Sequence, residues 1–161
     1  KIKYSNCSVI APYRDINGFM FRVVNPRDNQ LIEVEVTVTL SFKRKNSQIR
    51  DFFLLELERP KVVFLPSMWT IVHPINSSSP LYQLTENDVL EKEAEFIVMM
   101  KAFDETFSQT VYSRSSYRDS ETRWGQKFVY VISQDNDGTI VDVGRIDETE
   151  NAELNRVLVQ A

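Results

Sequence analysis

The sequence has 161 residues, a length that suits one domain and scarcely two. Hydrophobic residues make up 42% and charged residues 26%, which is typical of a globular domain and excludes a chain that is disordered throughout. The 19 basic and 23 acidic residues give a net charge of −4, which argues against a nucleic-acid surface. The single cysteine, Cys7, excludes an internal disulfide and a cysteine-rich zinc site.

Neither a membrane span nor a signal peptide is present in the sequence. No apolar run approaches the roughly 20 residues that cross a bilayer. The first residue is Lys rather than Met, so we expect a piece of a longer protein whose neighbouring segment holds any membrane part. Without repeats, low-complexity tracts or linkers, residues 1–161 are predicted to form a single domain.

The first elements along the chain are predicted to be strands. Phe19, Phe21 and Val23 indicate one strand, followed by a turn over residues 25–29. The clearest pattern then follows, an alternation of six apolar residues with polar ones: Ile32, Val34, Val36, Val38, Leu40 and Phe42. This alternation predicts a long strand with one solvated face, which would carry Glu33, Glu35, Thr37, Thr39 and Ser41.

Further strands are predicted over residues 52–57, 62–72, 95–103 and 108–114 and along Phe128, Tyr130 and Ile132. Asp135-Asn136-Asp137-Gly138 is typical of a hairpin turn, with a return strand over residues 140–146. Thr85 and Asp88 indicate a capped short helix, and the spacing of Leu154, Val157, Leu158 and Ala161 predicts a second helix at the C-terminus. Eight or so short strands with turns between them favour an all-β fold, a β-sandwich with short helices.

Catalytic and metal-binding patterns are weak. His73 is the only histidine, and it lies at a strand end, where a hydrogen bond to a loop is the favoured role. Asp135 and Asp137 suggest a calcium loop, but that alignment places Ser133 and Gly144 where acidic residues are required. We therefore predict no enzyme activity, no cofactor and no metal site.

Glu33 and Glu35 leave two interpretations open. On a monomer, the predicted polar face is an ordinary solvated surface. On a ring-shaped oligomer, the same face would line a polar channel.

Short blocks of sequence then indicate a family. The densest is Asp104-Glu105-Thr106-Phe107-Ser108-Gln109-Thr110-Val111, and the others include Met20–Asn25, Leu31–Val34, Trp69–Ile75, Ser79–Tyr82, Arg114–Tyr117 and Trp124-Gly125. In this order, between Tyr4 and Arg145, the blocks resemble the cytoplasmic domain of inward-rectifier potassium channels, the prokaryotic branch most closely. The resemblance implies an immunoglobulin-like β-sandwich that assembles as a homotetramer on the cytoplasmic face of the cell membrane, with the membrane helices outside this sequence.

The resemblance also implies roles for particular residues. Glu33 and Glu105 match pore-facing acidic residues beside the path of potassium ions. A loop that narrows the pore is matched by Thr106, Phe107, Ser108, Gln109 and Thr110. Arg27 and Arg114 match basic residues that form gating or intersubunit ion pairs.

Regulation by anionic lipid, polyamines or Mg²⁺ is compatible with this family, and no nucleic-acid partner is expected. The alternative is a soluble β-sandwich protein-interaction module, which would be monomeric and would use a sheet edge or a loop end to bind its partner.

Overall fold

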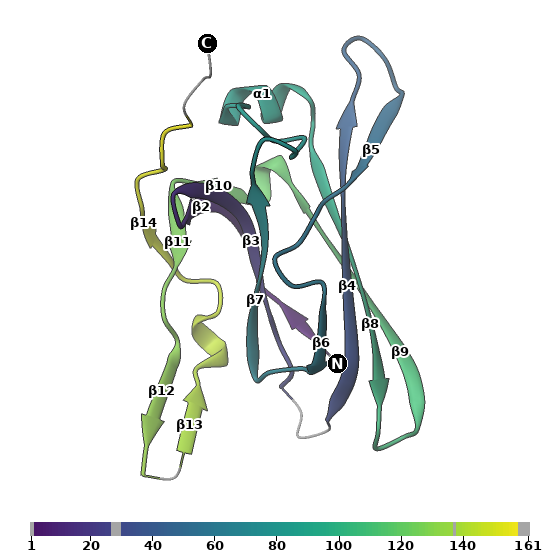
Figure 1. Ribbon diagram of the computed structural model, residues 1–161, viewed down its shortest axis with the longest axis vertical. Helices are drawn as coiled ribbons and strands as arrows, with labels where there is room; N and C mark the ends of the chain where they lie inside the picture. The colour runs from purple at the N-terminus through teal and green to yellow at the C-terminus, as the bar shows by residue number, and fades with distance from the viewer. Residues whose placement is uncertain (1, 27–29, 137, 158–161) are drawn as a thin grey trace.

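The computed structural model describes residues 2–26, 30–136 and 138–157. Two five-stranded sheets face each other, and two short strand pairs lie along the side of the first sheet (Figure 1). This arrangement confirms the predicted all-β sandwich.

The first sheet is built around β3, which pairs with strands on both sides. β1 and β2 pair with it along one side and β7 along the other, while β10 runs parallel to β2. The bounds of its strands are β1 Lys3–Tyr4, β2 Ser8–Tyr13, β3 Ile16–Val24, β7 Met68–Ile75 and β10 Thr122–Trp124.

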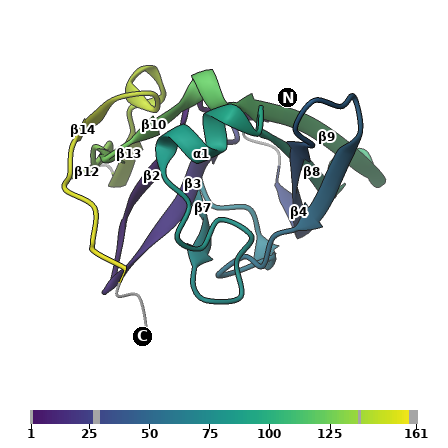
Figure 2. The same cartoon turned by 90° about the horizontal axis from the view of Figure 1, so that it is seen from above.

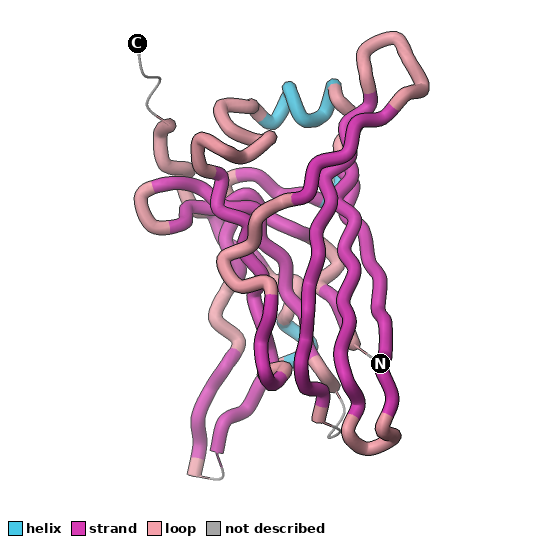
Figure 3. The backbone as a smooth tube through the Cα atoms, turned by 45° about the vertical axis from the view of Figure 1, so that its right-hand side comes forward, coloured by secondary structure: helices cyan, strands magenta, loops and turns pink. Residues whose placement is uncertain are grey.

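The second sheet is built around the long strand β4, which pairs with β8 on one side. On its other side β4 pairs with two short edge strands, β6 near its start and β5 near its end. β9 pairs with β8 over ten residues and completes the sheet (Figure 3). The bounds are β4 Leu31–Lys43, β5 Arg50–Leu54, β6 Lys61–Phe64, β8 Glu95–Asp104 and β9 Gln109–Arg118.

The remaining elements are short: α1 Glu86–Glu91, η1 Asp119–Glu121, β11 Gln126–Phe128, β12 Ile132–Asp135, β13 Gly138–Val141, η2 Val143–Arg145 and β14 Thr149–Asn151. The predicted capped helix is confirmed as α1, because the Thr85 side chain accepts from the Asp88 amide and the Asp88 side chain accepts from the Thr85 amide. The predicted hairpin is also confirmed, because Asp135 pairs with Gly138.

Aromatic side chains join the two sheets. The rings of Phe19 on β3 and Phe96 on β8 stack with centroids 3.8 Å apart, and both side chains are fully buried. Phe21 contacts Tyr117 at 5.5 Å between centroids, and the Tyr117 hydroxyl donates to the carbonyl of Ser5 at 2.7 Å. Burial raises the pKa of Tyr117, so its hydroxyl stays protonated and serves as a buried donor.

The predicted C-terminal helix is wrong for the residues that the structure describes. β14 pairs with β11 in an antiparallel ladder, and residues 152–157 continue without regular structure. Asn155 fastens this segment, because its backbone amide donates to Asn17 Oδ1 at 2.9 Å and its side-chain amide donates to the carbonyls of Arg14 and Ile16. Tertiary hydrogen bonds therefore override the helical spacing of Leu154 and Val157, and residues 158–161 lie outside the described part.

Three strand predictions also need correction. The strand predicted over residues 62–72 is divided into β6 and β7 by a segment that contains Pro66, which has no amide to donate. The strand predicted along 128–132 is interrupted between β11 and β12. The return strand ends at Val141, because the next residue, Asp142, accepts from the Gly144 amide and begins a 3₁₀ turn.

Candidate functional site

The two predicted acidic residues lie at one end of the second sheet. Leu31 at the start of β4 pairs with Asp104 at the end of β8, so β4 begins beside the β8–β9 turn (Figure 1, lower right). The Glu105 amide lies 3.5 Å from the Gln30 carbonyl, which joins the turn to the segment before β4. The structure therefore brings Glu33 and Glu105 to the same end of one sheet.

A β-bulge places Glu33. Ile32 pairs with Phe103 but Glu35 pairs with Lys101, so two residues of β4 oppose Ala102 alone. Glu33 has a positive φ of 49°, a left-handed conformation that is uncommon outside glycine. The bulge lets Leu31 and Val34 both enter the core while Glu33 stays exposed.

The unbroken alternation predicted for this strand is therefore wrong at both ends. Ile32 is half-buried rather than buried, because the bulge shifts the register before Glu35. Ser41 was expected on the solvated face, yet it is fully buried, and its hydroxyl oxygen accepts from Arg50 Nη1 at 3.0 Å.

Lysines lie beside the predicted acidic residues. Glu35 pairs directly with Lys61 on β6 and with Lys101 on β8, and Lys61 Nζ lies 3.1 Å from Glu35 Oε1. The four charged side chains Glu33, Glu35, Lys61 and Lys101 line one shallow hollow of about 370 Å³. Lys101 alternates with the apolar Met100 and Ala102 along a predicted strand, so its outward direction was readable from the sequence. Its place opposite Glu35 required the pairing of β4 with β8.

A buried carboxylate organises the turn between β8 and β9. Asp104 is only 6% exposed, and its Oδ1 accepts from the amides of Thr106 at 2.9 Å and Phe107 at 3.4 Å. Ser108 completes the turn with a positive φ of 49°. Phe107 is 67% exposed at the tip, so the turn presents an aromatic ring and hydroxyl groups to the outside.

The predicted narrowing loop is thus divided between two elements. Thr106, Phe107 and Ser108 lie in the turn, whereas Gln109 and Thr110 begin β9 and are exposed. The turn-capping role of Asp104 was missed, although Asp before a turn commonly accepts from the amide two residues later.

The two predicted arginines have different outcomes. Arg114 is exposed on β9, opposite Met99, and it forms no ion pair with another described residue. It lines a hollow of about 410 Å³ together with Phe107 and Gln109. Arg27 lies outside the described residues. The expected ion pairs of both arginines stay a prediction.

His73 has a structural environment. Its Nδ1 lies 2.5 Å from the Glu56 carbonyl and its Nε2 2.7 Å from Ser79 Oγ. Because a carbonyl only accepts, Nδ1 donates and Nε2 accepts from the Ser79 hydroxyl, which in turn accepts from the Leu81 amide. Burial lowers the pKa of His73, which favours this neutral form.

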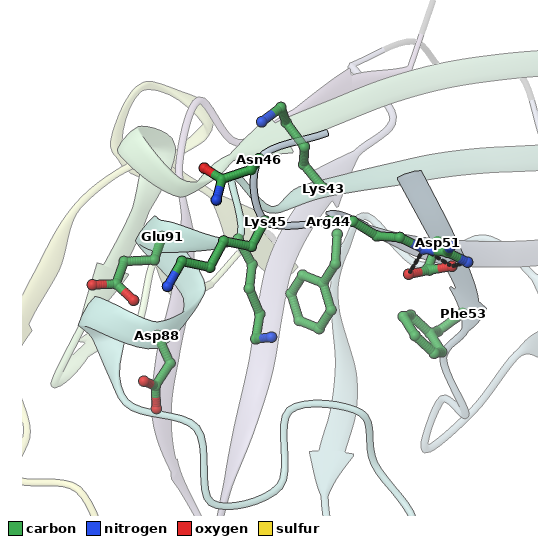
Figure 4. Close-up of a pocket in the computed structure, with 10 residues that line it drawn as sticks. Lys43, Arg44, Lys45, Asn46, Asp51, Phe53, Asp88 and Glu91 are labelled. Atoms are coloured by element: carbon green, nitrogen blue, oxygen red, sulfur yellow. Dashed lines mark hydrogen bonds and ion pairs between the residues drawn. The ribbon is translucent and has the colours of Figure 1, made fainter. Parts of the chain in front are cut away.

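A separate hollow lies where the β4–β5 loop meets α1 (Figure 4). Basic and acidic side chains are mixed there. Arg44 Nη2 pairs with Asp51 Oδ1 at 2.8 Å, and Glu91 on α1 lies near Lys45 of the loop, while Asp88 lines the hollow farther from Lys45. Across the described ranges, no group of three histidine, cysteine or acidic residues is placed to hold a metal ion. None of the described helices has the length and apolar character of a membrane span.

Comparison with known families identifies the chain. Residues 2–160 match the family model described as the inward rectifier potassium channel C-terminal domain. The chain belongs to this family. The match covers both sheets and the segment that follows them.

Relatives include channels from a bacterium and from mammals. The chain is 30% identical over 151 residues to inward rectifier potassium channel Kirbac3.1 from Paramagnetospirillum magnetotacticum. This match covers 91% of this chain and 51% of that protein. It is 28% identical to the human ATP-sensitive inward rectifier potassium channel 8, over 91% of this chain and 36% of that protein. It is 27% identical to the bovine G protein-activated inward rectifier potassium channel 4, over 92% of this chain and 37% of that protein. The chain thus spans about half the length, or less, of these relatives.

Proposed function

We propose that this chain is the cytoplasmic domain of an inward-rectifier potassium channel, where it extends the ion pathway and regulates its gating. Membership of the C-terminal domain family and the channel names of the relatives support this function. The observation that carries the proposal is the exposed pair of carboxylates, Glu33 and Glu105, at one end of a sheet with an uncovered outer face.

Four copies of the chain would surround the ion pathway as a homotetramer. Two carboxylates from each copy would face a narrow, water-filled path with walls of low dielectric, which focus the field and raise the local potassium concentration. Screening limits the reach of each charge to about 8 Å at physiological salt, so the effect depends on a narrow path. Mg²⁺ and polyamines, with their higher charge, would be held more strongly than potassium and would block outward flow.

The β8–β9 turn would act as the narrowest point. Asp104 fixes the turn through two backbone amides, so the tip would move as one body with the hairpin rather than as a loose loop. Arg27 and Arg114 would form ion pairs with carboxylates of a neighbouring copy, because a guanidinium orients a carboxylate through paired hydrogen bonds. Anionic lipid would act on gating by changing the position of these copies relative to the membrane part.

A soluble protein-interaction module is the second candidate. Phe52 and Leu54 on the edge strand β5 are 62% and 71% exposed, which suits a bound partner at a sheet edge. Such a module would be monomeric and would carry no potassium. Sedimentation of the full-length protein in detergent separates the two candidates, because the channel is expected as a tetramer.

The functional test is removal of both carboxylates, Glu33→Gln with Glu105→Gln, in the full-length protein reconstituted into lipid bilayers. We expect potassium current to persist, while the concentrations of spermine and Mg²⁺ that give half block rise by about tenfold, because the multivalent blocker loses several favourable charges. The matched control is Glu150→Gln with Glu153→Gln, which removes the same charge from exposed positions in and after β14. Block equal to that of the wild type in the first variant would refute the placement of these residues beside the pore, and a wild-type protein that carries no potassium would refute the function.

A further inference from the structure

The acidic surface of the second sheet carries its own counter-charges. In an antiparallel pair, directly opposite residues point to the same face of the sheet. Glu35 has such a partner on each side, Lys61 on β6 and Lys101 on β8. The two lysines therefore share the outer face with Glu35 and lie in the same hollow as Glu33.

The charges in this hollow cancel. Two carboxylates face two ammonium groups, and all four side chains belong to one hollow of about 370 Å³. Lys61 contacts Glu35 at 3.1 Å, whereas Lys101 is exposed and forms no ion pair with another described residue. Neither Glu33 nor Glu105 has a lysine opposite it in the β-ladders of the described residues, but Glu33 shares the hollow with both lysines, whereas Glu105 lies in the turn beyond it.

We propose that Lys101, together with Lys61, determines how strongly this surface holds multivalent cations, a proposal that rests on the function proposed above. Each ammonium group offsets the field of one carboxylate at a distance well inside the screening length. The surface then attracts cations mainly through Glu105, and it holds Mg²⁺ and polyamines less strongly than the same carboxylates would without the lysines. The domain is thus tuned toward weak rectification by two lysines rather than by the lack of acidic residues.

The dependence on blocker charge follows from the same electrostatics. The interaction energy scales with the charge of the bound cation, so the affinity changes exponentially with that charge. Removal of one lysine per copy should affect spermine, with a charge near +4, more than Mg²⁺, with a charge of +2. Lower ionic strength should enlarge both effects because screening is weaker.

The test is Lys101→Gln in the full-length protein, with potassium current recorded across a lipid bilayer while spermine or Mg²⁺ is added on the cytoplasmic side. We expect the half-blocking concentration to fall about fivefold for spermine and about twofold for Mg²⁺, with larger changes at 50 mM than at 300 mM salt. Lys61→Gln should act in the same direction, since it releases Glu35 from its ion pair. Lys101→Arg keeps the charge and should leave block unchanged.

Lys127→Gln is the matched control, because Lys127 is also an exposed lysine, on β11, and its partner Glu150 lies 3.5 Å away on β14. Unchanged or weaker block in both Lys101→Gln and Lys61→Gln would overturn the proposal, and so would an equal gain in the Lys127→Gln control. If Glu33→Gln with Glu105→Gln still weakens block in that case, the proposed function stands and only the role of the lysines fails. If the acidic variant is also without effect, the placement of this face beside the pore fails.

Discussion

The two sheets of the sandwich differ in what lies on their outer faces. The first sheet is covered, because Asn6 bonds to Asp147 through both its backbone and its side chain, and Arg22 donates to the carbonyl of Val129. Figure 2 shows the β12 and β13 pair beside β2 and β10. The outer face of the second sheet carries exposed side chains such as Tyr112 and Leu54, at 66% and 71%.

The environments of two arginines, one on each sheet, show the consequence of this difference. Arg22 on β3 is 4% exposed, under the ring of Phe128 at 4.6 Å, and two of its guanidinium nitrogens have no hydrogen-bond partner among the described residues. Burial lowers the pKa of Arg22. Arg114 on β9 is exposed and solvated. Arg22 on the first sheet is thus committed to the fold, whereas Arg114 on the second sheet is available to other molecules or other copies.

The largest expected difference in stability is between two phenylalanine substitutions, one in the core between the sheets and one on the uncovered face of the second sheet. Phe19→Ala should lower the free energy of unfolding by about 3–5 kcal/mol, because it removes a fully buried ring and its stack on Phe96. Phe52→Ala, on the uncovered face at 62% exposure, should change it by less than about 0.5 kcal/mol. Urea unfolding followed by circular dichroism measures both, and similar losses in the two variants would contradict the assignment of the faces.

The free energy of unfolding should also depend on pH, with a smaller effect than that of the core substitution. His73 on β7 has a pKa below its ordinary value because it is buried, so the unfolded chain binds a proton near pH 6.5 that the folded chain resists. The free energy of unfolding should therefore fall as the pH decreases below about 6.5, by up to roughly 1.4 kcal/mol per pH unit.

His73→Gln should remove this contribution, because His73 is the only histidine of the chain. Urea unfolding at pH 8 and pH 5 compares the two proteins. Parallel profiles would mean that His73 is protonated to the same extent in the folded and unfolded chains.

The smallest expected change in the free energy of unfolding is that caused by replacing each of the two arginines with methionine. Arg22→Met should raise the free energy of unfolding by about 1 kcal/mol, because an apolar side chain of similar length replaces a buried group with unsatisfied donors. Arg114→Met should stay within about 0.5 kcal/mol of the wild type. A marked loss of stability in Arg22→Met would show that the hydrogen bond to the Val129 carbonyl and the contact with Phe128 contribute more than the unsatisfied donors cost.

Much of the fold was accessible from sequence because local patterns and tertiary contacts agree there. The alternation from Val34 to Leu40 matches buried and exposed positions, and Asp135 to Gly138 forms the expected hairpin. The capping box at Thr85 needs only residues within one helical turn. In these segments the local preference and the global structure require the same conformation.

The remaining features depend on contacts between distant parts of the chain. Asn155 is held by Asn17 and the β2–β3 turn, 138 residues away, and this contact decides against the helix. The bulge at Glu33 follows from pairing with β8, about 70 residues later, so the strand alone predicts an uninterrupted alternation. For the candidate site, the resemblance identified Glu33 and Glu105, but only the pairing of β4 with both neighbours revealed Lys61 and Lys101 opposite Glu35.

The bulge gives β4 one residue more than regular pairing with β8 requires. Because side chains alternate with a period of two, loss of Glu33 would restore regular pairing and keep Leu31 in the core, whereas a regular strand of the present length would turn Leu31 out and bring Ile32 in. A substitution of Glu33 by glycine or asparagine would keep the left-handed backbone while it removes the carboxylate. Among homologues, this point of the strand should therefore tolerate the loss of one residue, whereas loss or gain of one residue within the regular part of β4 would exchange its two faces.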